Sequence, residues 1–281
     1  MTSELERART LTKNERGVRT GAIDESWHQG RGAFGGLLAA MALDAMSQDL
    51  NDAERIPRSL TVHFCGPATG AIALSTSIVR AGSRVAHATA RIDNESGVTT
   101  YASASFCKDR PHTSSGAESE RYVDASMPRV EDAASTPEMR LAGLPGVPQF
   151  FRHIDARFCA TPPFAWPFSA AKQPNVAAWV RLREAPSPGA LVDAPLAALL
   201  LDTLPPAVTA TFDTPRPLAS VDFTIHFFTD FARAAISAAD HQLVAIRSRW
   251  AADGYTEELR ELWSPRGGEL LAQCRQLIAL L

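Results

Sequence analysis

The sequence has 281 residues, of which 45% are hydrophobic and 21% charged, with a formal net charge of −3. This composition is typical of a globular protein with a sizeable core, and the lack of a basic run argues against a nucleic-acid partner. The N-terminus is polar and no apolar segment is long enough to suggest a membrane span. Four widely separated cysteines without a CxxC pair indicate neither a zinc site nor a disulfide framework, so we expect a cytoplasmic protein.

The first part of the chain predicts one helix followed by strands. Gly35 and Gly36 open an apolar helix that extends to about Met46. Alternating small or polar and apolar residues then predict strands at 60–64, 71–82, 84–93 and 98–107. Residues 109–147 are rich in Ser, Ala, Pro, Glu and Asp, which predicts a linker.

The second part of the chain repeats this order after two leading strands. Strands are predicted at 151–160 and 175–184, a helix in the stretch APLAALLLDTLPPA at 194–207, and further strands at 220–228, 241–252, 256–264 and 270–280. One helix followed by antiparallel strands predicts an α+β module in which the sheet wraps around a central helix. We therefore expect an N-terminal module at 1–108, a linker at 109–147 and a C-terminal module at 148–281.

Two pairs of similar segments support an internal duplication. LAAMALDAM at 38–46 and LAALLLDTL at 196–204 share five of nine residues, and LTVHF at 60–64 matches FTIHF at 223–227. The two matches occur in the same order at offsets of 158 and 163 residues. This regular spacing favours duplication over chance similarity.

Asp202 is an unusual residue in the second helix. Seven of the eight residues before it are Leu or Ala. Burying an aspartate in such surroundings costs several kcal/mol unless it is paired or hydrogen-bonded. Asp202 is therefore either a cap for the turn before Pro205-Pro206 or a functional carboxylate.

The duplicated pattern resembles the double-hotdog acyl-CoA thioesterase II family, which is TesB-like, and the resemblance covers nearly the whole chain. The FGG at 34–36 is similar to that family's N-terminal signature. The family's catalytic residues are an Asp on the second-half helix, a Thr or Ser in the next strand and a Gln in the last strand. The matching residues here are Asp202, Ser220 and Gln276.

The resemblance implies hydrolysis of acyl-CoA to a free fatty acid and CoA without a metal or organic cofactor. Asp202 would take a proton from water, and Ser220 and Gln276 would orient that water and the carboxylate. Direct attack by Asp202 to give an anhydride remains an alternative route. The N-terminus of the first helix, at Gly35 and Gly36, is a candidate oxyanion site, although these glycines could equally serve tight helix packing. Because hotdog proteins often assemble, homo-oligomers are also expected.

Two other functions stay open. A catalytically degenerate double-hotdog protein would bind acyl-CoA or acyl chains without turnover, and Ser in place of the commoner Thr keeps that alternative open. A dehydratase or hydratase is less favoured: HFCGPATG at 63–70 is similar to a dehydratase motif, but that motif precedes the central helix and this segment follows it.

The repeat partners of these residues predict that the first-half site is incomplete. Asp44 corresponds to Asp202, but Phe106 lies near the position that matches Gln276, so we interpret Asp44 as a structural remnant. His63 and His226 are also repeat partners. They have no HxH or HxxxH grouping, so we interpret them as strand residues rather than metal ligands.

Overall fold

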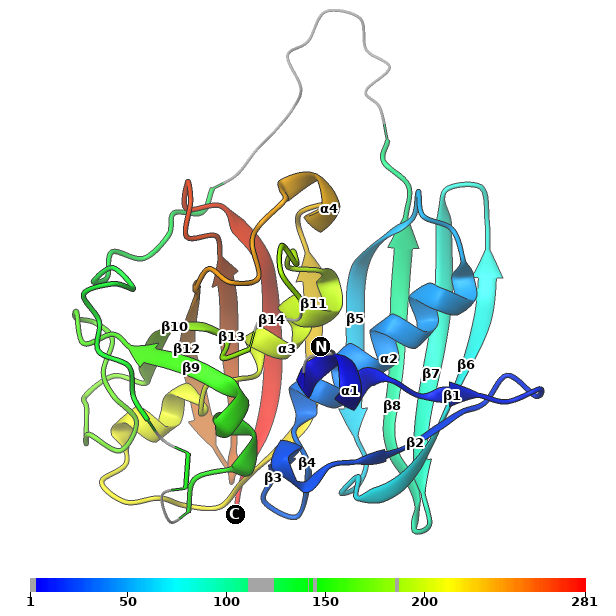
Figure 1. The fold of residues 1–281 in the computed structure, drawn as a ribbon. Coiled ribbons are helices and arrows are strands. Elements are labelled where there is room, and N and C mark those ends of the chain that lie inside the picture. Colours follow the sequence, from blue (N-terminus) through cyan, green and yellow to red (C-terminus); the bar gives the residue numbers. More distant parts are fainter. Residues whose placement is uncertain (1–3, 111–123, 141, 144–145, 185–186) are drawn as a thin grey trace, which may run out of the picture.

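A twelve-stranded antiparallel sheet forms the body of the protein (Figure 1). The structure is a computed structural model that describes residues 4–110, 124–140, 142–143, 146–184 and 187–281. Its strands, in sheet order, are β1 (Thr12–Lys13), β2 (Arg19–Ile23), β6 (Gly70–Ala81), β7 (Val85–Asn94), β8 (Gly97–Cys107), β5 (Ile56–Phe64), β11 (Leu218–Phe227), β14 (Leu270–Leu280), β13 (Tyr255–Trp263), β12 (Gln242–Ala252), β10 (Asn175–Leu182) and β9 (Ile154–Phe158). The strands β3 (His28–Gln29) and β4 (Gly32–Ala33) pair separately.

Four α-helices accompany the sheet in the described part of the chain. They are α1 (Glu4–Arg9), α2 (Gly35–Leu50), α3 (Ala194–Leu201) and α4 (Phe231–Ala234). The two longer ones, α2 and α3, contact each other and lie against the sheet, α2 on β5 to β8 and α3 on β13 and β14 (Figure 1). No helix in the described ranges is both long and apolar enough to cross a membrane.

The two halves join where β5 pairs with β11. Leu60 lies opposite Ile225 and Thr61 opposite Thr224, so the two segments that matched in sequence lie side by side. All first-half strands lie on one side of this seam and all second-half strands on the other. This arrangement confirms the predicted double hotdog, and the sheet is continuous across the two halves.

The helix α2 is apolar around nearly its whole circumference. This composition suits its position, because the sheet and α3 enclose it. Every residue from Gly36 to Met46 except Asp44 is buried. A helix that is hydrophobic all round is expected in such a position. The helix continues one turn beyond the predicted end, and Asn51 closes it in a left-handed conformation with φ 47°.

The helix α3 is shorter than the apolar stretch suggested. Asp193 caps its N-terminus by accepting a hydrogen bond from the Leu196 N–H at 2.7 Å. The helix ends at Leu201, and Asp202 is its C-terminal cap, since Pro205 and Pro206 prevent further helical turns. Asp202 therefore lies one residue beyond the helix and not within it, as had been expected. Its backbone N–H caps the helix end, in agreement with the interpretation of Asp202 as a cap.

The described part of the predicted linker, 124–140, packs on the second-half sheet. The Trp179 indole N–H donates to the backbone oxygen of Glu131 at 2.6 Å, and Met127 and Val130 join the apolar cluster that contains Trp179. The rest of that linker includes 111–123, 141 and 144–145, which lie outside the described residues. The module boundaries at 108 and 148 stay a prediction.

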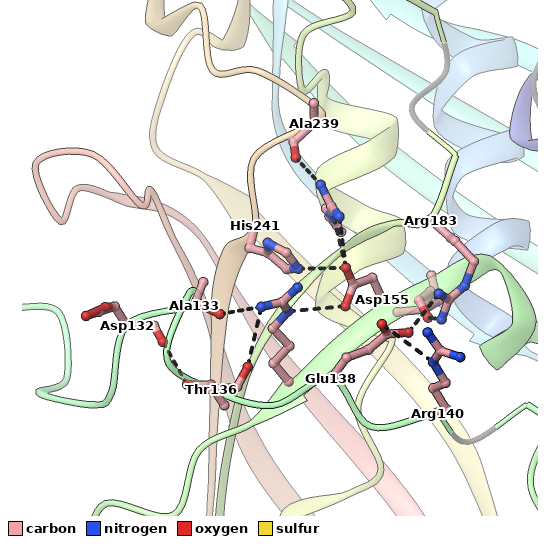
Figure 2. Close-up of polar contacts among 12 residues, drawn as sticks. Asp132, Ala133, Thr136, Glu138, Arg140, Asp155, Arg183, Ala239 and His241 are labelled. Carbon is pink, nitrogen blue, oxygen red and sulfur yellow. Dashed lines mark hydrogen bonds and ion pairs between the residues drawn. The ribbon is translucent and has the colours of Figure 1, made fainter.

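A buried carboxylate at the edge of the sheet holds this segment in place (Figure 2). Asp155 on β9 lies 3.0 Å from His241 Nε2 and 3.0 Å from the Arg181 guanidinium. A second arginine beside Asp155, Arg157, donates to the backbone oxygen of Ala133 at 2.6 Å. This cluster therefore connects the outer segment to β9 and β10.

Candidate active site

Asp202 is buried at the C-terminal end of α3. Its relative exposure is 7%, and the predicted site residue Gln276 on β14 is its hydrogen-bond donor, with Nε2 3.3 Å from Asp202 Oδ1. Burial raises the pKa of Asp202 from 3.8 to about 6, against the lowering effects of Arg260 and of the Gln276 hydrogen bond. A carboxylate with a pKa near neutrality can accept and release a proton readily.

The three residues predicted from the second half meet in space. The Gln276 side-chain amide also donates to Ser220 Oγ at 2.7 Å, so one amide group connects the carboxylate of Asp202 with the hydroxyl of Ser220. The other amide atom, Gln276 Oε1, is buried and accepts no hydrogen bond from the described residues. A buried acceptor without a donor is suited to a water molecule or a polar substrate group.

A β-bulge directs Ser220 into this site. In β11, Phe223 and Ile225 are buried on the inner face, and strict alternation from them would place Ser220 on the outer face. Ser220 pairs with Ile278 and Asp222 pairs with Leu277, so Val221 is an extra residue on this strand. The bulge reverses the alternation and brings the Ser220 hydroxyl to the face that carries Gln276. No signal in the sequence predicted this bulge.

The first half contributes the N-terminus of α2 to the same site. A Cβ added at Gly35 would lie 2.8 Å from Asp202 Oδ2, and the backbone N–H of Gly36 lowers the pKa of the Asp202 carboxyl. Tight packing is also evident, because a Cβ at Gly36 would lie 2.9 Å from the Leu199 backbone oxygen. The two candidate groups predicted separately, the glycines and Asp202, are therefore parts of one site that spans both halves.

An ion pair next to Asp202 was not predicted from the sequence. Glu258 and Arg260 on β13 are 0% and 1% exposed, and Arg260 Nη1 lies 3.8 Å from Asp202 Oδ1. The signal was present, since opposite charges two residues apart in a strand lie on one face. Charged strand residues are usually exposed, however, so the pattern TEELRELW alone did not indicate burial.

The counterpart site in the first half lacks the matching side chains. Leu60 corresponds to Phe223 and pairs with Ala104, as Phe223 pairs with Gln276, so Ala104 rather than the predicted Phe106 is the structural match of Gln276. At the position of Ser220 the first half has Pro57, which also borders a bulge. Neither residue offers a polar side chain.

Asp44 faces a cavity of about 450 Å³ instead. It lies 3.2 Å from the Arg9 guanidinium and accepts a hydrogen bond from Gln48 at 3.2 Å. Asp193, at the N-terminus of α3, lines the same cavity. This cavity thus combines a helix N-terminus from one half with the repeat-partner aspartate of the other, as the Asp202 site does, but the Asp44 carboxylate is partly exposed whereas that of Asp202 is buried.

The repeat-partner histidines lie outside the site. His63 and His226 are both exposed and lie on neighbouring strands of the seam, which agrees with their interpretation as strand residues. Within the described ranges, no group of three or more His, Cys, Asp and Glu residues is arranged to hold a metal ion.

Solved structures with the same fold cover the whole chain. A conserved protein with a hot dog fold from Alicyclobacillus acidocaldarius has 26% identity and a TM-score of 0.84, and covers 100% of this chain and 99% of its own. The tesB protein from Mycobacterium avium subs paratuberculosis has 17% identity and a TM-score of 0.76, with 100% of both chains covered. The acyl-CoA thioesterase II TesB2 from Mycobacterium marinum has 19% identity and a TM-score of 0.72, with 99% and 98% covered.

Family models match both halves. The acyl-CoA thioesterase N-terminal domain matches residues 23–107, and the acyl-CoA thioesterase C-terminal domain matches residues 124–280. The comparison with curated proteins finds no match. Because the two family models together span most of the sequence in the expected order, the chain belongs to the acyl-CoA thioesterase family.

Proposed function

We propose that the protein hydrolyses acyl-CoA to a free fatty acid and CoA, with Asp202 as the general base. The observation that carries this proposal is the buried Asp202 carboxylate, which has a raised pKa and lies between the α2 N-terminus and the Gln276–Ser220 pair. Family membership supports the substrate class. The cytoplasmic location and the formation of homo-oligomers stay predictions.

The reaction needs one water and one proton relay. Asp202 takes a proton from water, and the hydroxide forms the new bond to the thioester carbon. The carbon–sulfur bond then breaks, and the CoA thiolate receives the proton from Asp202. Gln276 holds the carboxylate through its hydrogen bond, and Ser220, which the same amide group contacts, offers its hydroxyl to the water.

The developing negative charge on the thioester oxygen requires nearby donors. The N-terminus of α2 provides backbone N–H groups and the positive end of a sixteen-residue helix. The backbone N–H groups of Gly35 and Gly36, in the first turn of this helix, are the candidate donors to the oxyanion.

A free-thiol assay against acyl-CoA esters of different chain length tests the proposal. CoA release that depends on Asp202 supports it. Tight acyl-CoA binding without CoA release at any chain length would instead favour the degenerate binding protein. Formation of an enoyl product from a 3-hydroxyacyl substrate would favour the dehydratase, although the exposed position of His63 on the sheet gives that reaction no support.

The pH dependence of turnover should report the Asp202 carboxyl. A general base acts only when deprotonated, so kcat should be constant at neutral and basic pH and should fall as the pH drops through the pKa of about 6. Initial rates of CoA release across this range measure the acid limb of the pH–rate profile, which is the fall in kcat toward low pH. A limb near the ordinary aspartate value of 3.8, or none at all, would contradict the assignment.

Gly35→Ala should lower kcat. The new Cβ would lie 2.8 Å from Asp202 Oδ2 and 2.9 Å from Phe64 Cζ, so the carboxylate must move. Displacing a catalytic group by about 1 Å can cost about 10²-fold in rate. Gly66→Ala is the matched control, because its Cβ would meet only the Val98 oxygen at 3.6 Å. Equal turnover in the two variants would show that Gly35 has no role in the site.

A further inference from the structure

Glu258 and Arg260 on β13 form a fully buried ion pair. This pair contacts the backbone before and after Asp202 in the sequence. Arg260 Nε donates to Glu258 Oε1 at 2.7 Å, and Arg260 Nη2 lies 2.6 Å from the same oxygen. Desolvating two charges is costly, and replacing such a pair by apolar residues is often neutral or stabilising. Fold stability alone therefore does not account for this pair.

The remaining polar atoms of the pair bind the chain turn that carries Asp202. Arg260 Nη1 donates to the backbone oxygens of Leu201 at 2.9 Å and Leu204 at 3.1 Å. Glu258 Oε2 accepts from the Ala207 backbone N–H at 2.7 Å. These three contacts fasten residues 201–207 to the sheet before and after Asp202, and they satisfy carbonyl groups that the end of α3 leaves unpaired.

We propose that Glu258 and Arg260 are the positioning pair of the active site: they hold the turn that presents Asp202, and Arg260 lies next to its carboxylate. This inference rests on the proposed function of Asp202 as the base. Neither residue is assigned a contact with substrate, so both act through Asp202.

The charged groups around Asp202 act in opposite directions. Arg260 lowers the pKa of Asp202, whereas Glu258 raises it. From β14, Cys274 also faces this cluster, and burial raises the pKa of its thiol well above the usual value, so it stays neutral. The other neighbours of Asp202 are uncharged. They are Gln276 on β14, which also contacts Ser220 on β11, and the Gly36 N–H of α2. Burial remains the largest influence on the pKa of Asp202, and Arg260 and Glu258 are the charged side chains that modify it.

Two single substitutions should move the acid limb of the pH–rate profile in opposite directions. Arg260→Met removes the stabilising positive charge and should shift the limb to higher pH by about 1–3 units. Glu258→Gln removes the opposing negative charge and should shift the limb to lower pH. The double variant Glu258→Gln/Arg260→Met should have its limb between those of the two single variants. A purely structural pair would lower activity without this opposite displacement.

The variant Arg260→Lys distinguishes the effect of the positive charge on the pKa of Asp202 from the effect of the contacts that position it. Lysine keeps the positive charge but lacks the planar fork that binds Glu258 and two backbone oxygens together. The acid limb should therefore stay near that of the wild type, while kcat at neutral and basic pH falls and KM changes little. Arg275→Met is the matched control, since Arg275 on β14 forms an exposed pair with Glu257 on β13. It should leave both the limb and kcat unchanged.

Full pH–rate profiles of the complete protein, with thermal unfolding of each variant, test the inference. If Arg260→Met does not fold, Glu258→Gln and Arg260→Lys decide, by a lowered limb in the first and an unchanged limb in the second. Shifts in the same direction, or no shifts in folded variants, would overturn the inference. Absence of CoA release by the wild-type protein, or an acid limb that persists in Asp202→Asn, would instead overturn the proposed function.

Discussion

Asp202→Asn should lower kcat for acyl-CoA hydrolysis by about 10²–10⁴-fold, the usual cost of losing a general base. Asparagine keeps the shape of the side chain, and its carbonyl oxygen can still accept the Gln276 hydrogen bond that now reaches Oδ1. Substrate binding should therefore be preserved, and the loss should appear in kcat rather than in KM. Steady-state CoA release measures both constants.

The same substitution should leave stability unchanged or increase it at neutral pH. The pKa of Asp202 in the folded protein, about 6, lies above its ordinary value of 3.8, so the folded state disfavours the charged carboxylate. This penalty is fully present above pH 6 and disappears as the pH falls to about 3.8. It amounts to at most about 3 kcal/mol, and Asn loses part of the gain because Arg260 then faces a neutral group. Unfolding at mildly basic and acid pH measures the difference.

Asp44→Asn is the internal control for Asp202→Asn. It changes the repeat-partner aspartate in the same way, but Asp44 lies beside Arg9 in a site without counterparts of Ser220 and Gln276. Turnover should therefore stay close to that of the wild type. If Asp44→Asn abolished turnover and Asp202→Asn did not, the active site would lie at the Asp44 cavity and Asp202 would be only a helix cap.

Much of this architecture could be predicted because duplication repeats local patterns. The apolar helices were recognisable from composition, and the duplication predicted two modules of the same kind; that β5 and β11 are the strands that join them is seen only in the structure. The meeting of Asp202 and Gln276 could also be predicted, since the family pattern orders them along the chain. These features depend on short segments and their order.

Other features depend on contacts between distant segments and carried no local signal. The bulge at Val221 changes which side of β11 faces inward, and it becomes visible only once the partner strand β14 is aligned. The burial of Glu258 and Arg260 depends on the turn after α3, which supplies the backbone groups they bind. The approach of Gly35 to Asp202 depends on how the two halves dock. Alternation and propensity within one strand or helix cannot indicate any of these.

The fragment 1–110 should not form a stable monomer. Removing the second half exposes the edge of β5, a nine-residue strand of which five residues, Ser59 to His63, pair with β11 in the full chain. It also exposes the side of α2 that contacts α3, including the surface at Gly36. A long unpaired edge next to an exposed apolar helix favours aggregation or self-pairing.

Size-exclusion chromatography and denaturant unfolding of the fragment measure this expectation. We expect aggregates or self-associated species, and recovery of a folded complex when 1–110 is co-expressed with 124–281, because the complementary strand β11 is then available. A monomeric fragment 1–110 that unfolds cooperatively would show that the first half is an independent domain, and the seam would then be an interface between two preformed modules rather than a part of one folding unit.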